Sequence, residues 1–331
     1  MMKKRILTGD RPTGNLHIGH LIGSLQNRVL LQNDYETFIL LADVQALTTH
    51  FEHPEKLQEN TYKVAIDNLS VGLDPNKVTF IVQSMVPAIA ELTIFYSMLV
   101  SVNVLRHNPT IKTEAASYGY DDLTYGFLGY PVSQTADITF CKANLVPVGE
   151  DQLPHMELTR KIVRRFNSLY NCDILVEPEA RLSNCPRLPG LDGNSKMGKS
   201  LGNAIYLCDT PETIKTKICS AVTDPTRISV KDKGHPEVCS VYKYHTVFNP
   251  QNSENICQMC KNAQVGCIAC KNELYAKLNS ILEPIRARRA YYESHKSEVK
   301  DILMSGTQKA NLIGNEVVAE VKNAMGITIL N

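Results

Sequence analysis

The sequence has no excess of charge of either sign and no apolar run of membrane length. Its 35 Lys and Arg residues stand against 34 Asp and Glu residues, so the net charge is +1. A nucleic-acid-binding surface on this chain must therefore be a local patch, because no global basic field exists. The start Met1-Met2-Lys3-Lys4 is not followed by a long apolar stretch. We therefore expect no signal peptide, no membrane contact and a cytoplasmic location.

Tryptophan, internal repeats and low-complexity segments are also missing from the 331 residues. No Ser/His/Asp or Cys/His arrangement suggests a covalent nucleophile. Hydrophobic residues make up 43% of the chain and charged residues 21%. These proportions are typical of an ordinary globular protein with enough core for two domains.

The first half of the chain alternates apolar strand patterns with longer helical patterns. A first strand is expected at Ile6-Leu7, and buried strands are expected over 37–42 and 78–82. Crossover helices are expected over 56–73 and 90–102. This rhythm predicts an α/β fold with a doubly wound, Rossmann-like parallel sheet, in which ligands bind at the carboxyl ends of the strands.

The strand rhythm stops after Leu207, and the chain becomes helical and rich in cysteine. We predict a Rossmann-like domain over 1–203 and a helical domain over 204–298. The amphipathic stretch 299–328, read as one or two helices, is expected to complete the first domain.

A His-x-Gly-His motif, His17 to His20, follows the first strand and a turn broken by Gly and Pro. A helix that begins there exposes free backbone N–H groups and a positive dipole end, which suit the phosphates of a nucleotide. His17 and His20 are three residues apart and share a face of the helix. Gly19 has no side chain and so lets a flat base approach the backbone. The alternative is that both histidines are capping or solvated residues.

The stretch 193–200 matches the P-loop pattern G-x-x-x-x-G-K-[ST] letter for letter. That pattern requires a buried strand before it and a helix after it. Two prolines and a glycine in 184–192 exclude a central strand, and Gly202 and Asn203 disfavour a helix. We therefore predict a glycine-hinged loop in which Lys196 and Lys199 close over a triphosphate.

These two motifs resemble the HIGH and KMSKS elements of class I aminoacyl-tRNA synthetases. The segments 126–138 and 146–160 resemble those of the bacterial tryptophanyl-tRNA synthetases, and the likeness extends from Arg5 to about Met325. It implies that tryptophan is activated with ATP to an adenylate and then passed to the 3′-terminal adenosine of tRNA(Trp). It also implies a homodimer, and a tRNA-binding role for the helical domain.

The resemblance assigns catalysis to positioning and to charge stabilisation at phosphorus. His17 and His20 would contact the phosphates, while Lys196 and Lys199 would hold the β- and γ-phosphates with Mg²⁺. The implied ATP site further includes Arg11, Pro12, Thr13, Gly19, Lys112, Gly149, Glu150, Asp151, Leu188, Met197, Gly198 and Ser200. Two departures stand out, because Gly198 replaces the middle Ser of KMSKS and Glu114 replaces a second family lysine.

A tryptophan pocket needs an acceptor for the indole N–H, and a carboxylate is the natural choice. The resemblance gives this role to Asp137. It gives the substrate's ammonium and carboxylate to Tyr130 and Gln152. The remaining implied pocket residues are Gly9, Val146 and Val148. Gln45 and Gln134 stand where relatives usually carry His and sometimes carry Met, respectively.

Four cysteines read as C-x2-C-x6-C-x2-C, which is a zinc-site pattern: Cys257, Cys260, Cys267 and Cys270. Cys239 is a fifth candidate, and four thiolates suit either zinc or an iron–sulfur cluster. Ten cysteines in such a chain point to a reducing cytosol. Some bacterial relatives carry a [4Fe–4S] cluster on a spacing that matches Cys239, Cys260, Cys267 and Cys270. The resemblance therefore favours the cluster, with Zn²⁺ as the alternative.

A basic and aromatic stretch near the end of the helical domain contains Arg286, Arg288 and Arg289 with Tyr291 and Tyr292. It could meet tRNA phosphates and bases, or be a solvated helix face. Two competing functions stay open from the sequence. One is a tyrosyl-tRNA synthetase, and the other is a non-catalytic tRNA-binding paralogue.

Overall fold

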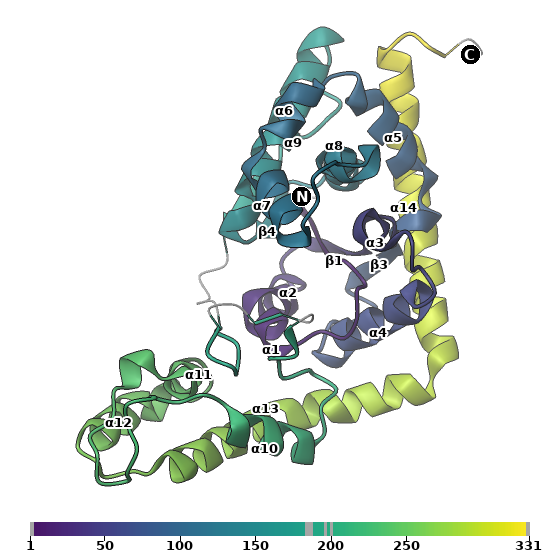
Figure 1. The fold of residues 1–331 in the computed structure, drawn as a ribbon. Coiled ribbons are helices and arrows are strands. Elements are labelled where there is room, and N and C mark those ends of the chain that lie inside the picture. Colours follow the sequence, from purple (N-terminus) through teal and green to yellow (C-terminus); the bar gives the residue numbers. More distant parts are fainter. Residues whose placement is uncertain (1–2, 183–187, 195–196, 199–200, 329–331) are drawn as a thin grey trace.

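A five-stranded parallel sheet forms the centre of the larger part of the molecule (Figure 1), in the order β3-β2-β1-β4-β5. The computed structural model describes residues 3–182, 188–194, 197–198 and 201–328. The strands are β1 (Arg5–Asp10), β2 (Glu36–Leu41), β3 (Val78–Val82), β4 (Leu145–Val148) and β5 (Glu179–Leu182). The predicted α/β class and the first three expected strands are confirmed.

Alternate residues of the strands feed two apolar clusters, one on each face of the sheet. Phe38 and Leu40 of β2 belong to one cluster, and Ile39 and Leu41 belong to the other. Such two-sided burial explains why the parallel strands read as continuous apolar runs. The first cluster is covered by α5 (Pro87–Ser97), α8 (Tyr125–Thr139) and α9 (Leu153–Leu169), and the second by α4 (Leu57–Ser70).

The strand order reverses at β1, which pairs with β2 on one side and with β4 on the other. Chain order runs outward from β1 through β2 to β3, and then crosses to β4 and β5. In open α/β sheets the crevice at such a reversal is where ligands bind, beyond the carboxyl ends of the strands. The predicted site residues on and after β1 and β4 therefore converge on this crevice.

Five shorter helices also belong to this part of the described chain: α1 (Ile18–His20), α2 (Gln26–Leu31), α3 (Asp43–His50), α6 (Val102–Arg106) and α7 (Pro109–Tyr118). A π-helical turn over Leu21–Leu25 joins α1 to α2. The expected helix over 90–102 was wrong in extent, because α5 ends at Ser97 and α6 begins at Val102. The Ser101 hydroxyl accepts a hydrogen bond from the Val104 N–H, which starts the new helix.

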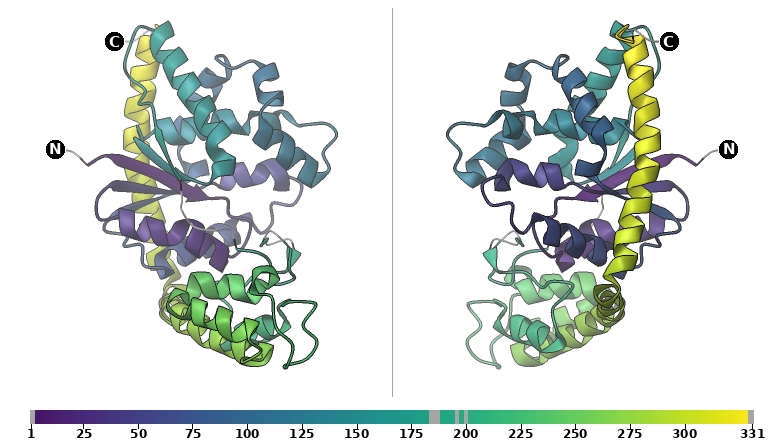
Figure 2. Two further views of the ribbon diagram at one scale, coloured as in Figure 1. Left: turned by 90° about the vertical axis from the view of Figure 1, so that its left-hand side faces the viewer. Right: turned by 90° about the vertical axis from the view of Figure 1, so that its right-hand side faces the viewer.

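Four helices form a second group beside the sheet, visible as the green elements in both views of Figure 2. They are α10 (Pro211–Ser220), α11 (Ser240–Phe248), α12 (Pro250–Lys261) and α13 (Cys267–Ser294). The chain enters this group along the first motif, because Ile18 N donates to Ile205 O at 2.9 Å and Leu207 N to Leu16 O at 3.0 Å. These bonds anchor the helical group beside the start of α1.

The last helix, α14 (Lys296–Ala324), is a single helix of 29 residues that returns along the sheet (Figure 1). It covers the edge strand β3, whose Val82 N–H donates to Thr307 Oγ1 at 3.1 Å. Covering an edge strand removes a surface on which another chain could pair. None of the helices in the described ranges combines the length and apolar character that a membrane crossing requires.

Candidate active site

The first motif forms a tight helix start directly after β1. His17 is the N-cap of α1, and its Nδ1 accepts a hydrogen bond from Gly19 N at 3.1 Å. The His17 N–H in turn donates to His20 Nδ1 at 3.2 Å. The two rings lie with their centroids 3.9 Å apart. Both histidines therefore cap the helix, and the same arrangement holds their rings together at the crevice.

The described part of the second motif packs against the first. A Cβ built on Gly19 would lie 3.5 Å from Met197 Sδ and 2.8 Å from the His17 ring. Gly198 N donates to Asn203 Oδ1 at 3.0 Å, and Asn203 Nδ2 donates to Asp192 at 3.0 Å. The two motifs, 178 positions apart from Gly19 to Met197, thus meet in space.

The predicted Lys196, Lys199 and Ser200 lie outside the described residues. In the described residues 188–194 no strand precedes the loop, and no α-helix occupies 201–207. Both observations agree with the rejection of a P-loop, which needs a strand before it and a helix after it.

A buried ionic network holds the carboxyl end of β1. Arg28 Nη1 lies 2.6 Å from Asp10 Oδ2, and Asn68 Nδ2 donates to the same oxygen at 3.0 Å. Burial alone would raise the pKa of Asp10, but the Arg28 guanidinium outweighs it and lowers the pKa to about 2. Beside it, Gly9 leaves no room for a Cβ against Leu40 of β2. Sequence reasoning missed this network, because its members come from three separate elements.

Asp137 lies on α8 and is 2% exposed. Its Oδ1 accepts a hydrogen bond from Gln83 Nε2 at 2.7 Å, at the end of β3. Burial raises the pKa of Asp137 to about 7, the Gln83 hydrogen bond opposes this, and the nearby Asp43 carboxylate adds to it. A carboxylate in this setting is well suited to reading a single N–H donor. Gln83 was not foreseen, although its position directly after a buried strand was a usable signal.

Tyr130 is fixed by a histidine that sequence reasoning also missed. The Tyr130 hydroxyl lies 2.9 Å from His155 Nε2, and Asn108 Nδ2 lies 3.5 Å from His155 Nδ1. Burial lowers the pKa of His155 to about 4. The imidazole is therefore neutral at neutral pH and orients the phenol without adding charge.

Charged groups surround the same tyrosine. Arg11 Nη2 lies 3.3 Å from Glu114 Oε1 on α7. Thr110 Oγ1 donates to Asp151 O at 2.8 Å, and Gln152 Nε2 donates to Asp151 Oδ2 at 3.0 Å. Helix α7 and the short turn that begins at Glu150 are therefore held together at this point.

The other predicted residues divide by burial. Pro12, Leu188 and Val146 are buried, and Val148 packs partly buried on the cluster that contains Tyr130. Lys112 and Glu150 are exposed, and Thr13 N donates to Arg11 O at 2.8 Å. A Cβ on Gly149 would lie 2.8 Å from Asp151 Oδ1, so this glycine permits the close turn after β4.

Four of the five cysteines under consideration are close neighbours in the helical group. The pKa of the Cys270 thiol is raised to about 12. Burial is the largest cause, and the next largest are the neighbouring thiols of Cys239, Cys260 and Cys267. Cys257 instead lies against Tyr242. Burial is the largest cause that raises the pKa of Tyr242, and a hydrogen bond with Cys257 is the next. Within the described ranges, no group of three or more His, Cys, Asp or Glu side chains is arranged to hold a metal ion.

The basic stretch on α13 is largely engaged inside the protein. Arg289 is 5% exposed and forms a buried ion pair with Asp67 of α4. Arg288 Nε donates to Ser70 O at the end of α4, and Arg286 Nη2 donates to Asn279 Oδ1 at 2.6 Å. Neither alternative given for this stretch, a tRNA contact or a solvated helix face, holds for Arg289, because its charge is compensated by the buried Asp67 carboxylate.

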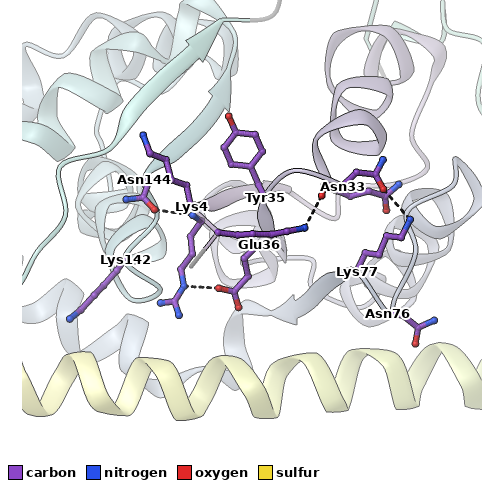
Figure 3. Close-up of a pocket in the computed structure, with 11 residues that line it drawn as sticks. Lys4, Asn33, Tyr35, Glu36, Asn76, Lys77, Lys142 and Asn144 are labelled. Carbon is purple, nitrogen blue, oxygen red and sulfur yellow. Dashed lines mark hydrogen bonds and ion pairs between the residues drawn. The ribbon is translucent and has the colours of Figure 1, made fainter. Parts of the chain in front are cut away.

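A cavity of about 790 Å³ opens at the opposite edge of the sheet (Figure 3). It is lined by residues at the amino ends of the strands, among them Lys4, Glu36, Lys77 and Asn144. None of the predicted site residues lines it. The candidate active site is therefore defined by the meeting of the two motifs and not by this cavity.

Comparison with known proteins gives concordant matches. The family model described as tRNA synthetases class I (W and Y) matches residues 2–283. A tryptophan–tRNA ligase of Streptococcus pneumoniae serotype 4 is 48% identical over 100% of both chains. A tryptophanyl-tRNA synthetase of Campylobacter jejuni, solved with ADP and tryptophan, has a TM-score of 0.86 at 30% identity, over 97% of this chain and 99% of that one. A tryptophanyl-tRNA synthetase of Mycoplasma pneumoniae has a TM-score of 0.81 at 26% identity, over 99% of both.

Proposed function

The chain belongs to the class I tRNA synthetases for tryptophan and tyrosine, and on that premise we propose an active site at the crevice between β1 and β4. The protein is an aminoacyl-tRNA synthetase that uses ATP with Mg²⁺ to join tryptophan to tRNA(Trp). The observation that carries the site assignment is Asp137, a buried carboxylate held by Gln83. An indole N–H is a donor only, so it needs such an acceptor.

The amino-acid half of the site comprises Asp137 for the indole and Tyr130 with Gln152 for the charged end of the substrate. Val146 and Val148 supply apolar walls, and Gly9 at the end of β1 is proposed as a further contact to the substrate. The contact of Tyr130 with His155 supports this assignment, because it fixes the hydroxyl in one orientation. A positioned polar group binds a substrate with less loss of conformational freedom than a mobile one.

The nucleotide half comprises the capped turn of His17, Gly19 and His20. Its exposed helix start suits the phosphates. Lys196 and Lys199 would hold the β- and γ-phosphates, and the packing of Met197 beside Gly19 supports a loop that lies over the same turn. The remaining contacts to ATP are proposed for Arg11, Pro12, Thr13, Lys112, Gly149, Glu150, Asp151, Leu188, Gly198 and Ser200.

In the reaction, a carboxylate oxygen of tryptophan forms a bond to the α-phosphorus of ATP. The bond from that phosphorus to the bridging oxygen breaks, and pyrophosphate leaves. The protein supplies no covalent intermediate, so its contribution is orientation and compensation of the developing charge. In the second step, the terminal ribose hydroxyl of the tRNA attacks the carbonyl and releases AMP.

We propose that residues 204–298 form the domain that binds tRNA(Trp), and that 1–203 with 299–328 form the catalytic domain. The contact of α14 with β3 supports the second part of this division. The tRNA-binding assignment, a homodimer and a cytoplasmic location are supported by the likeness to the family.

We propose a [4Fe–4S] cluster and not a zinc site for the four neighbouring cysteines. Cys239, Cys260 and Cys267 each raise the pKa of another member of the set, and all three raise that of Cys270, whereas Cys257 lies against Tyr242. A zinc site on the C-x2-C pattern requires Cys257. We therefore propose that these four thiolates would hold the cluster. Arg227 Nη1, 3.6 Å from Cys260 Sγ, would compensate part of the negative charge.

Amino-acid-dependent exchange of pyrophosphate into ATP tests this function directly. We expect strong exchange with tryptophan and weaker exchange with tyrosine, by about 10⁴- to 10⁵-fold, because the site must hydrogen-bond a specific ring group. Comparable rates with tyrosine would favour a tyrosyl-tRNA synthetase. No exchange with any amino acid would favour the non-catalytic paralogue.

A further inference from the structure

Glu114 on α7 is an acidic residue that neighbours Arg11 of the proposed ATP site and Tyr130 of the proposed amino-acid site. Its Oε1 is paired with Arg11 Nη2 at 3.3 Å. Its Oε2 is buried and makes no hydrogen bond of good geometry within the described part of the chain. A buried carboxylate oxygen normally has a donor, since leaving it without one is costly. The position therefore calls for a donor that arrives with a ligand.

The Glu114 carboxylate lies beside the Tyr130 hydroxyl. After burial, the charge of Glu114 and then a hydrogen bond between its carboxylate and the Tyr130 hydroxyl are the next largest influences that raise the pKa of Tyr130, and Asp151 acts in the same direction. Arg11 opposes both carboxylates. The one Tyr130 hydroxyl also lies 2.9 Å from His155 Nε2, so it is shared between Glu114 and His155. Two carboxylates, Glu114 and Asp151, and one guanidinium, Arg11, thus surround the Tyr130 hydroxyl. These three side chains carry a net charge of about −1, so one further positive charge would neutralise them. The neighbouring His155 does not supply that charge, because burial keeps it neutral.

We propose that Glu114 binds the α-ammonium group of the amino-acid substrate, next to the hydroxyl of Tyr130. This inference rests on the proposed function, in which Tyr130 faces the charged end of tryptophan. An ammonium group brings one positive charge and three N–H donors. It satisfies Glu114 Oε2 and balances the charge of the pocket. Glu114 thereby becomes a specificity residue for α-amino acids over other indole carboxylates.

The competing role for Glu114 is to hold Arg11 for ATP. Both roles use the same carboxylate, but they differ in which ligand binds more weakly when the Glu114 carboxylate is removed. Removal of a carboxylate that binds ammonium weakens ligands that carry an amine. Removal of a carboxylate that only positions Arg11 changes the affinity for ATP and has the same effect on the affinity for every indole ligand.

The chain has no tryptophan, so the fluorescence of indole ligands can be followed directly on binding to the full-length protein. We compare L-tryptophan, tryptamine, which lacks the carboxylate, and 3-indolepropionate, which lacks the amine. Glu114→Gln is expected to weaken L-tryptophan and tryptamine by about 10- to 100-fold and to leave 3-indolepropionate within about twofold. Glu316→Gln, at an exposed position on α14, is the matched control and should change none of the three.

Equal weakening of all three ligands, or a selective rise in the KM for ATP, would overturn the proposal in favour of the Arg11 role. Unchanged affinity for tryptamine in Glu114→Gln would also overturn it. A second variant, Glu114→Asp, keeps the charge and should recover part of the tryptamine affinity if the proposal is right. Pyrophosphate exchange by the wild-type protein with tryptophan separates the outcomes. If the wild-type protein shows no exchange, the proposed function is refuted. If it shows exchange but Glu114→Gln binds all three ligands as the wild-type protein does, only this inference is refuted.

Discussion

Asp137 combines its proposed role as the acceptor of the indole N–H with an energetic cost. Burial raises its pKa from the usual 3.8 to about 7, against the opposing hydrogen bond from Gln83. Between these two values the folded chain binds more protons at this residue than the unfolded chain does. The contribution of Asp137 to the free energy of unfolding therefore falls as the pH rises from about 4 to 7. A residue that destabilises the ionised folded state is typical of a binding site that needs the charge.

This titration predicts a pH dependence of tryptophan binding. Below pH 7, protonation of Asp137 removes the charged acceptor of the indole N–H, so the Kd for tryptophan should rise by up to about tenfold per pH unit. Titrations that follow the fluorescence of bound tryptophan between pH 5.5 and 8 measure this Kd. Asp137→Asn should bind more weakly and show a flat profile. The assignment is wrong if this variant keeps the wild-type pH profile.

At the scale of elements, α14 is fitted to the sheet edge by a glycine. A Cβ on Gly306 would lie 2.9 Å from the backbone N of Phe80 on β3, and backbone cannot give way as a side-chain end can. Thr307 and Lys309 on the same helix bond to Val82 and Thr79 of that strand. The helix therefore approaches β3 closely enough for its side chains to bond directly to this edge strand.

We expect Gly306→Ala to lower the free energy of unfolding by about 1–3 kcal/mol, because the added methyl group overpacks the contact with β3. Urea unfolding of the full chain measures this change. Gly129→Ala on α8 is the matched control, since its Cβ would meet nothing within 4 Å. It should be neutral or stabilise by up to about 1 kcal/mol. Equal effects of the two substitutions would show that helix α14 does not depend on this close approach.

At the scale of the whole molecule, one buried carboxylate connects the helical group to the turn of the first motif. Asp67 of α4 is ion-paired with Arg289 of α13. Its other oxygen accepts a hydrogen bond from Leu16 N at 2.8 Å, directly before the first motif. Asp67 thereby links α13, α4 and the residues directly before the first motif.

The proposed cluster lies in the helical group, so its loss should damage tRNA charging more than pyrophosphate exchange. Anaerobically purified protein is expected to be brown, with broad absorbance near about 400 nm. Cys239→Ser should remove the colour, and the matched change Cys257→Ser should retain it. A colourless protein with one bound zinc that depends on Cys257 would decide for the zinc site.

The local sequence determined the first three strands, the helix start at His17 and the residue types that suit a nucleotide and an indole. These depend on periodicity over a few residues and on short motifs, which local steric and hydrogen-bonding preferences control. The same local rules also excluded a P-loop, because Pro and Gly precede it. They misplaced the end of α5, since a single Ser cap at position 101 outweighed the apolar pattern.

Only the tertiary structure decided which polar groups meet. Gln83 and Asp137 are 54 positions apart, Tyr130 and His155 are 25 apart, and Arg289 and Asp67 are 222 apart. Local pattern says that such groups are polar but not whether a charge is buried or which partner compensates it. That outcome depends on how elements pack, because desolvation and pairing act through space and not along the chain. The roles of Glu114 and of Arg289 both follow from this long-range arrangement.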